Sequence, residues 1–173
     1  MTAPRGNPHR TPPAVPMTIS QICVVVHDIE AALETYSRTC GWGPWNVYEY
    51  APPLLHDTTL RGEPVEFRMI GAETSVNGLG FELIQPVSGP SIYQEHLDEK
   101  GEGVQHIAVM QHSWDDSAAM KRHWSEQGAD VLMYGRIGDS IEFYYLDTDP
   151  LLKFVLESGS GHAIELKPSY VYQ

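Results

Sequence analysis

The sequence contains no long hydrophobic run. None of its apolar stretches approaches the roughly 20 residues that a membrane-spanning helix requires. The N-terminus is rich in proline, whereas a secretory signal would have a charged head followed by an apolar core. We therefore expect a cytoplasmic protein that does not contact membranes.

Cysteine and basic residues are also scarce. The two cysteines, Cys23 and Cys40, have neither the number nor the spacing of a disulfide framework or a zinc knuckle, and are predicted to be reduced, buried thiols. Eleven Lys and Arg stand against 23 Asp and Glu, a formal charge of −12, which would repel nucleic acids and anionic lipids. A strongly anionic substrate would need a local basic patch, for which Arg61, Arg68 and Arg136 are the candidates.

The length of 173 residues suits one compact domain. Residues 1–16 contain five prolines and few large apolar side chains, so a mobile arm is predicted. The remaining chain divides into a first module at 17–90, a linker helix with a second module at 91–157, and a C-terminal extension at 158–173.

The pattern of strands and helices occurs twice. In the first module an apolar strand from Met17 leads to an N-cap at Asp28 and a helix, and then to strands at 46–50, 65–70 and 80–85. After a short helix at 92–100, the second module has a strand from Val104, a helix at 115–127 and strands at 131–134, 141–146 and 154–157. The predicted fold class is α+β, with two tandem βαβββ modules, and one more short strand is expected at 163–166.

Potential metal ligands lie at equivalent points of this repeat. Gln21 and His106 lie at equivalent points of the first apolar strand of each module, and Glu82 and Glu157 lie in later apolar strands of the two modules. Taken alone, Gln21 and His106 are more typical of ordinary strand residues. Carboxylates among Phe, Leu, Ile and Val are seldom buried unless they are paired or bind a metal, although a strand with one solvent-exposed face would leave them in contact with water. A twofold arrangement would bring all four residues together.

The segments QICVVVHDIEAALETYSRTCGW, GEGVQHIAVMQHSWDD and FYYLDTDP resemble those of the vicinal oxygen chelate superfamily, which includes glyoxalase I, methylmalonyl-CoA epimerase, extradiol dioxygenases and antibiotic-resistance binding proteins. The resemblance implies a curved, half-open sheet around a central cleft. It also implies one divalent metal ion in that cleft, with the ligands Gln21, Glu82, His106 and Glu157. Glu165 is an alternative to Glu157 as the fourth ligand.

The types of these four residues narrow the chemistry. Two carboxylates, an amide oxygen and an imidazole suit a hexacoordinate Zn, Mn, Co, Ni or Mg ion with water in the open positions. They do not form the two-His, one-carboxylate triad of Fe(II) oxygenases, so an extradiol dioxygenase is disfavoured. Animal glyoxalase I is similar to this chain in having Gln, Glu, His and Glu, whereas epimerases more often have His at the first position.

Such a metal favours an isomerase, epimerase or lyase that acts on a carbonyl compound through an enolate. Glu66, in VEFRMIGA, resembles a catalytic glutamate of methylmalonyl-CoA epimerases. Glu66 and Glu157 are therefore predicted to be the general bases, and Arg68 is predicted to bind a substrate oxyanion. The alternative for Glu66 is an exposed strand residue paired with Arg68.

Aromatic residues predict the wall of the substrate pocket. Trp42, Trp45, Tyr48 and Tyr145 are the candidates for substrate binding, and an uncharged, polyketide-like carbonyl compound is as compatible with them as a CoA thioester. By resemblance, a homodimer is expected. The competing hypothesis is a metal-free small-molecule binding protein of the resistance type.

Overall fold

The computed structural model describes residues 15–161 and 166–173 of the chain. The predicted N-terminal arm and Glu165 lie outside these residues, except for Val15 and Pro16. Within the described ranges, 11 strands form one open sheet in the order β11-β2-β5-β6-β1-β7-β10-β9-β8-β3-β4. No helix of this part of the chain has the length and apolarity needed to cross a bilayer.

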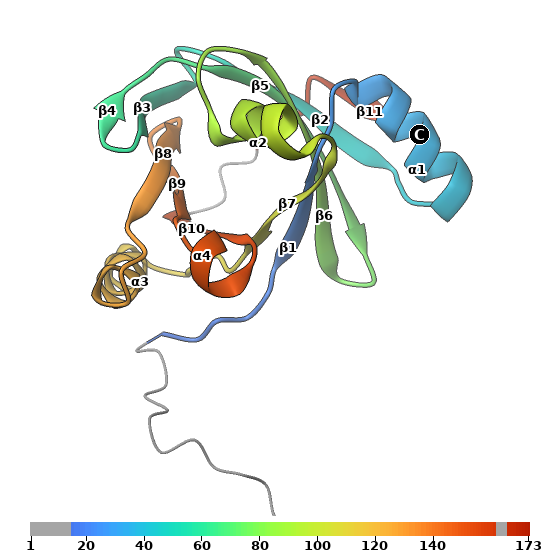
Figure 1. Ribbon diagram of the computed structural model, residues 1–173. Helices are drawn as coiled ribbons and strands as arrows, with labels where there is room; N and C mark the ends of the chain where they lie inside the picture. The colour runs from blue at the N-terminus through green and yellow to red at the C-terminus, as the bar shows by residue number, and fades with distance from the viewer. Residues whose placement is uncertain (1–14, 162–165) are drawn as a thin grey trace, which may run out of the picture.

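The first module consists of β1 (Gln21–Val25), α1 (Ile29–Cys40), β2 (Trp45–Tyr50), β5 (Arg68–Val76) and β6 (Leu79–Ser88). The second consists of β7 (Gly103–Ala108), α3 (Trp114–Glu126), β8 (Val131–Ile137), β9 (Ile141–Leu146) and β10 (Val155–Gly161). Helix α2 (Ile92–Lys100) connects the modules, and the short helix α4 (Asp149–Leu152) precedes β10. The predicted α+β fold with two βαβββ modules is confirmed (Figure 1).

The two modules have the same internal topology. The first strand of each pairs in parallel with its last strand, β1 with β6 and β7 with β10. The antiparallel pairing of β1 with β7 then joins the modules into one sheet, with Cys23 opposite His106 and Gln21 opposite Ala108. This junction lies at the centre of the sheet.

Local sequence signals determine the helix ends. The Asp28 side chain accepts a hydrogen bond from the backbone N–H of Ala31, 3.0 Å away, as the predicted N-cap requires. At the other end of α1, Gly41 adopts a φ of 68°, in the left-handed region, and its N–H bonds the Ser37 carbonyl. The predicted linker helix at 92–100 has the observed bounds of α2, and α3 begins and ends one residue before its predicted range.

Three strands were not predicted. β3 (Leu55–Leu60) and β4 (Glu63–Pro64) come from the first module in sequence but extend the edge of the second module, where β3 pairs with β8. β11 (Tyr170–Tyr172), from the C-terminal extension, pairs with β2 at the opposite edge. The strand predicted at 163–166 falls mostly outside the described residues.

The short link between β2 and β3 requires a strongly curved sheet. Eight strand spacings separate the two strands in the sheet order, about 38 Å if the sheet were flat. Residues 51–54 connect them, and the chain from Tyr50 to Leu55 reaches at most about 19 Å. The sheet therefore folds around a central space, in agreement with the predicted cleft.

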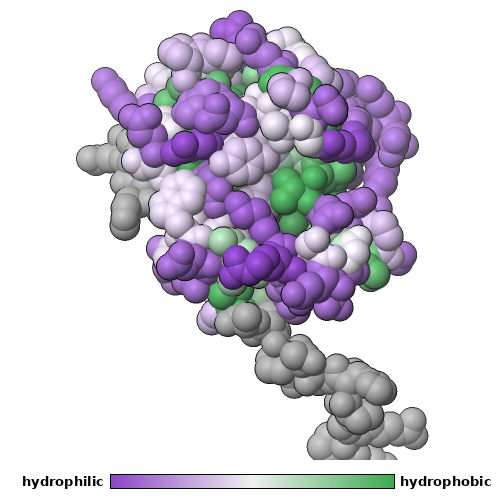
Figure 2. All heavy atoms as spheres, turned by 90° about the vertical axis from the view of Figure 1, so that its left-hand side faces the viewer, coloured by the Kyte–Doolittle hydropathy of each residue, from purple (hydrophilic) through white to green (hydrophobic). Residues whose placement is uncertain are grey.

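Strand alternation distributes side chains between the two faces of this sheet. One outer-face cluster packs α1 against the first module through Ile29 and Leu33, and another packs α3 against the second through Met120 and Trp124. A third cluster fills part of the concave side and includes residues of both modules and of α2. Figure 2, viewed from the α3 side, shows a largely hydrophilic surface around a small hydrophobic area.

Thr148 ties the start of β10 to the preceding turn. Its buried hydroxyl donates to the Phe154 carbonyl at 2.9 Å and accepts from the Leu156 N–H at 2.8 Å. Leu156 directly precedes Glu157, so these bonds help to set the position of that carboxylate.

We predict that Thr148→Val lowers the free energy of unfolding by about 1–3 kcal/mol, because it leaves the buried Leu156 N–H and Phe154 carbonyl without this partner. Urea unfolding curves measure the change. The control is Thr39→Val, which removes an exposed hydroxyl bonded to Thr35 in α1 and should change stability by no more than about 0.5 kcal/mol. Equal losses in the two variants would contradict the assignment.

Candidate metal centre

Three of the four predicted ligands meet on the concave face of the central strands. The Nε2 atom of His106 lies 3.1 Å from Oε2 of Glu157 and 3.5 Å from Oε2 of Glu82. The His106 ring is completely buried and both carboxylates are nearly so. The fourth residue, Gln21, is half-buried and lines the same cavity.

The sheet register explains this convergence. On β6, Glu82 is the partner of Cys23, and on β10, Glu157 is the partner of Ala108. Cys23 and Ala108 each lie two residues after the first ligand of their module, Gln21 and His106. The four side chains are thus related by the approximate twofold symmetry that the repeat predicted.

Neighbouring residues orient the His106 ring and the Glu157 carboxylate. His106 Nδ1 lies 2.6 Å from Oε1 of Gln105, and because an amide oxygen only accepts, Nδ1 carries the hydrogen. Tyr145 donates to Oε1 of Glu157 at 3.1 Å, and the hydroxyl groups of Tyr93 and Tyr145 are 2.6 Å apart. Burial raises the pKa of both tyrosines, so they remain protonated donors.

A buried ring nitrogen beside two carboxylates makes this site suitable for a cation. Among the described residues, Nε2 of His106 is fully buried and has no hydrogen-bond partner, although it faces two carboxylates. Burial disfavours a charged ring, but the acidic groups Cys23 and Glu157 beside it raise the pKa of His106, so a metal ion at Nε2 would replace the proton there. Candidate ligand atoms of Cys23, Glu82 and His106 also lie within 4.8 Å of one another. The donor set therefore fits a divalent metal ion.

Burial and like charge act on the acidic groups. Burial raises the pKa of Glu82, and the negative charge of Glu157 adds to this effect. Glu73, on β5 beside Glu82 in the sheet, has its pKa raised to about 8, first by burial and then by the charges of Glu82 and Glu157. Burial also raises the pKa of the Cys23 thiol. A cation among these groups would relieve both desolvation and repulsion.

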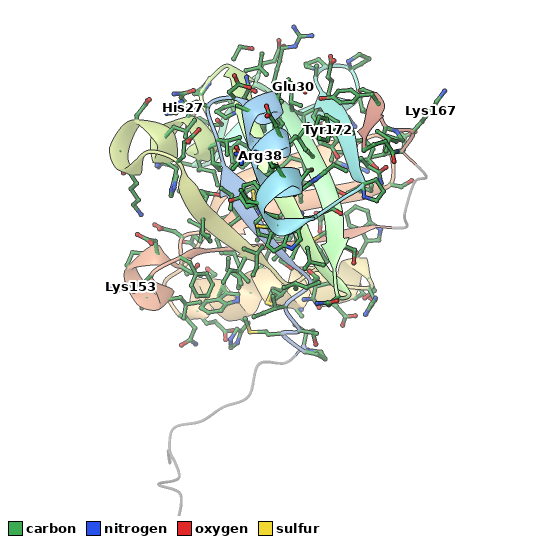
Figure 3. The ribbon with its side chains drawn as sticks, turned by 90° about the vertical axis from the view of Figure 1, so that its right-hand side faces the viewer. His27, Glu30, Arg38, Lys153, Lys167 and Tyr172 are labelled. Atoms are coloured by element: carbon green, nitrogen blue, oxygen red, sulfur yellow. The ribbon has the colours of Figure 1, made fainter. Side chains whose placement is uncertain are left out.

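The cavity above this site has a volume of about 830 Å³. Its walls are mainly apolar and aromatic, and its charged lining consists of Glu73, Glu82, Glu157 and Lys167. Lys167 lies at the edge of the molecule and extends outward (Figure 3). Tyr48 and Tyr145, two of the four aromatic residues predicted to bind substrate, line the cavity, and Tyr50, Met69, Phe143 and Met110 complete much of the apolar wall.

Two predicted substrate-binding aromatic residues lie on the other side of the sheet. Trp45 is completely buried in the cluster beneath α1, and Trp42 packs against the same cluster, with its ring 4.7 Å from that of Phe81. Because alternate residues of β2 face opposite sides, Trp45 and Val47 face α1 while Tyr48 faces the cavity. The structure therefore does not bring Trp42 and Trp45 to the site.

Glu66 and Arg68 also lie outside the cavity. The expectation that Glu66 lies on a strand is wrong, because β5 begins at Arg68. Phe67 and Met69 are buried in the concave core, so the alternate residues Glu66 and Arg68 are exposed. The acidic residue that β5 contributes to the cavity is Glu73, which pairs with Glu82 on β6. In the sequence, Glu73 and Glu82 lie at equal distances before and after the turn at Asn77 and Gly78, and this spacing was the available signal for their pairing.

Solved structures resemble this chain along most of its length. A methylmalonyl-CoA epimerase from Mycobacterium tuberculosis is 18% identical, with a TM-score of 0.60 over 90% of this chain and 95% of that one. A hypothetical protein from Bacillus halodurans is 16% identical, with a TM-score of 0.62 over 85% and 96%. A Streptomyces coelicolor methylmalonyl-CoA epimerase with bound 2-nitronate-propionyl-CoA is 24% identical, with a TM-score of 0.54 over 86% and 96%. At these identities the likeness shows the fold.

No curated protein is significantly similar to this chain in sequence. The sequence profile of the glyoxalase/bleomycin resistance protein/dioxygenase superfamily matches residues 20–145, which include both modules up to β9. With the repeated βαβββ topology, this match shows that the chain belongs to that superfamily, the vicinal oxygen chelate proteins.

Proposed function

We propose that this protein is a divalent-metal-dependent isomerase, epimerase or lyase that acts on a small carbonyl compound through an enolate. The observation that carries this proposal is the buried Nε2 atom of His106, which has no hydrogen-bond partner among the described residues and faces Glu82 and Glu157. The superfamily and the fold of the epimerases support an enzyme of this kind.

Gln21, Glu82, His106 and Glu157 would hold the ion, which is Zn, Mn, Co, Ni or Mg. A divalent ion supplies a positive charge that stabilises the negative charge developing on a substrate oxygen. Gln105 would keep the lone pair of His106 Nε2 directed at the ion, and Tyr145 would fix the orientation of Glu157.

We infer that Glu157 and Glu73 move the proton. Both carboxylates line the cavity, from β10 and β5 respectively, and so approach a bound molecule from different strands. No described side chain forms a hydrogen bond or ion pair with Glu73, which leaves it available to a substrate C–H or O–H group. Glu73 therefore replaces the exposed Glu66 as the second proposed general base.

The lining of the cavity supports an uncharged substrate. Aromatic and aliphatic side chains form most of the wall, and the carboxylates of Glu73, Glu82 and Glu157 are also part of it. Among the described residues Lys167 is the one basic residue that lines the cavity, and its side chain extends outward (Figure 3). We therefore favour a neutral, apolar carbonyl compound over a CoA thioester or a glutathione adduct. Cytoplasmic location and a homodimer stay predictions.

The second candidate is a metal-free binding protein of the same superfamily. The apolar cavity favours it, because a volume of about 830 Å³ would enclose a small organic molecule without any reaction. Metal content and proton exchange distinguish the two candidates.

We predict that the purified protein holds about one divalent ion per chain, and that His106→Ala and Glu157→Gln lose it, because each removes a donor from the site. Elemental analysis measures the ion, and circular dichroism verifies folding. The matched controls are His112→Ala and Glu66→Gln, which change exposed residues of the same types and should keep the metal. A folded wild-type protein that binds none of the five ions would overturn the metal-dependent function.

We predict that Gln105→Ala weakens Zn²⁺ binding roughly 10- to 100-fold, because the His106 ring loses the partner of Nδ1. Competition with a chelating indicator measures the affinity. Gln94→Ala, which removes an exposed glutamine of α2, should leave the affinity unchanged. Unchanged affinity in Gln105→Ala would mean that Gln105 does not orient the ring.

We predict that the metal-loaded protein exchanges the C–H hydrogen beside the carbonyl of a suitable neutral aryl ketone for deuterium in D₂O. A panel of aryl hydroxyketones and β-keto esters, followed by nuclear magnetic resonance, tests this. Glu73→Gln and Glu157→Gln should abolish exchange, whereas Glu66→Gln should retain it. Compounds that raise the melting temperature but show no exchange would favour the binding protein.

A further inference from the structure

Cys23 lies within the candidate metal centre, although none of the four predicted ligands is a cysteine. Its side chain is fully buried on β1, the strand between β6 and β7. In the sheet register it is the direct partner of Glu82 on one side and of His106 on the other. Cys23 is therefore at the centre of a row of three metal-binding residue types on adjacent strands.

The distances within this row suit a single ion. The candidate ligand atoms of Cys23, Glu82 and His106 are all within 4.8 Å of one another. Bonds of about 2.0–2.3 Å from one ion to nitrogen, oxygen and sulfur place the ligand atoms roughly 3–4.5 Å apart. Small side-chain adjustments would bring the three atoms to that spacing.

A second observation points to an ion at the same place. Nε2 of His106 is fully buried and, within the described part of the chain, makes no hydrogen bond. Burying a polar atom without a partner costs free energy, and a metal bond would remove this cost. The buried thiol lies close to the imidazole ring that carries this nitrogen.

We propose that Cys23 is a direct ligand of the divalent ion, and that its sulfur makes the centre prefer Zn²⁺ or Co²⁺ to Mg²⁺ or Mn²⁺. This inference rests on the proposed metal-dependent function and narrows its cofactor. Cys23 is fully buried and Gln21, two residues earlier on the same face, is half-buried. Cys23 would thus bind the inner side of the ion and Gln21 the side toward the cavity.

The preference follows from the hardness of the donors. Thiolate is a soft ligand that suits zinc and other late metals, whereas magnesium and manganese favour carboxylate, carbonyl and water oxygens. Formation of the sulfur–metal bond replaces the S–H bond, and the proton leaves to solvent. The step needs no oxidant or reductant.

The test uses cobalt as a spectroscopic probe in the full chain. We expect that addition of Co²⁺ to the metal-free protein produces a sulfur-to-cobalt charge-transfer band in the near ultraviolet. Cys40 is exposed, so the prediction that both thiols are buried is wrong for this residue, and Cys40→Ser serves as the matched control. Cys40→Ser should keep the band, and Cys23→Ser should lose it. Cys23→Ser should also weaken Zn²⁺ binding by more than the roughly 10- to 100-fold loss caused by removing an outer-shell partner.

Zinc-edge X-ray absorption of the wild-type protein gives a readout that does not depend on any variant folding. A sulfur scatterer at about 2.3 Å would support Cys23 as a ligand. Zinc bound with only nitrogen and oxygen neighbours, together with cobalt bound without the band, would overturn this inference and leave the metal-dependent function standing. A folded wild-type protein that binds Mn, Ni or Mg but neither zinc nor cobalt would overturn this inference alone, and one that binds none of the five ions would overturn both.

Discussion

The antiparallel pairing of β1 with β7 is the interaction on which the site depends. It joins two modules, each of which carries a glutamate on its last strand, and it places Cys23 and His106 opposite one another. The parallel pairings of β6 and β10 then bring Glu82 and Glu157 in from the two flanks. A one-residue shift in this register would turn the ligands to the outer face, where α1 and α3 pack.

This arrangement concentrates groups that are costly to bury. Two carboxylates face one imidazole nitrogen at 3.1 and 3.5 Å, and a third carboxylate, Glu73, lies on the neighbouring strand. Removing such groups from water is unfavourable unless they are paired, hydrogen-bonded or bound to a metal. Tyr145 and Gln105 satisfy part of the requirement. A bound cation would satisfy the rest, and this physical need is the strongest argument for a metal-dependent reaction.

The roles of several residues depended on which face of a strand they occupy. Tyr48 and Trp45 lie three residues apart in one aromatic stretch, yet alternation directs Tyr48 to the cavity and Trp45 to the core beneath α1. The prediction that Glu66 is a catalytic base lacks support for a related reason, because Phe67 and Met69 face the core there and Glu66 is exposed. Glu73, which composition did not distinguish from the other acidic residues, acquires its position from the pairing of β5 with β6.

From the sequence alone one could determine the repeated order of strands and helices and the N-cap of α1. One could also determine the equivalence of Gln21 with His106 and of Glu82 with Glu157. All of these depend on local periodicity and on short-range spacing. Only the tertiary structure decided that β3 and β4 extend the second module, that Cys23 lies between Glu82 and His106, and that Glu73 rather than Glu66 faces the cavity. These features arise from pairing between strands that are distant along the chain, and from the curvature that such pairing imposes, neither of which leaves a local pattern in the sequence.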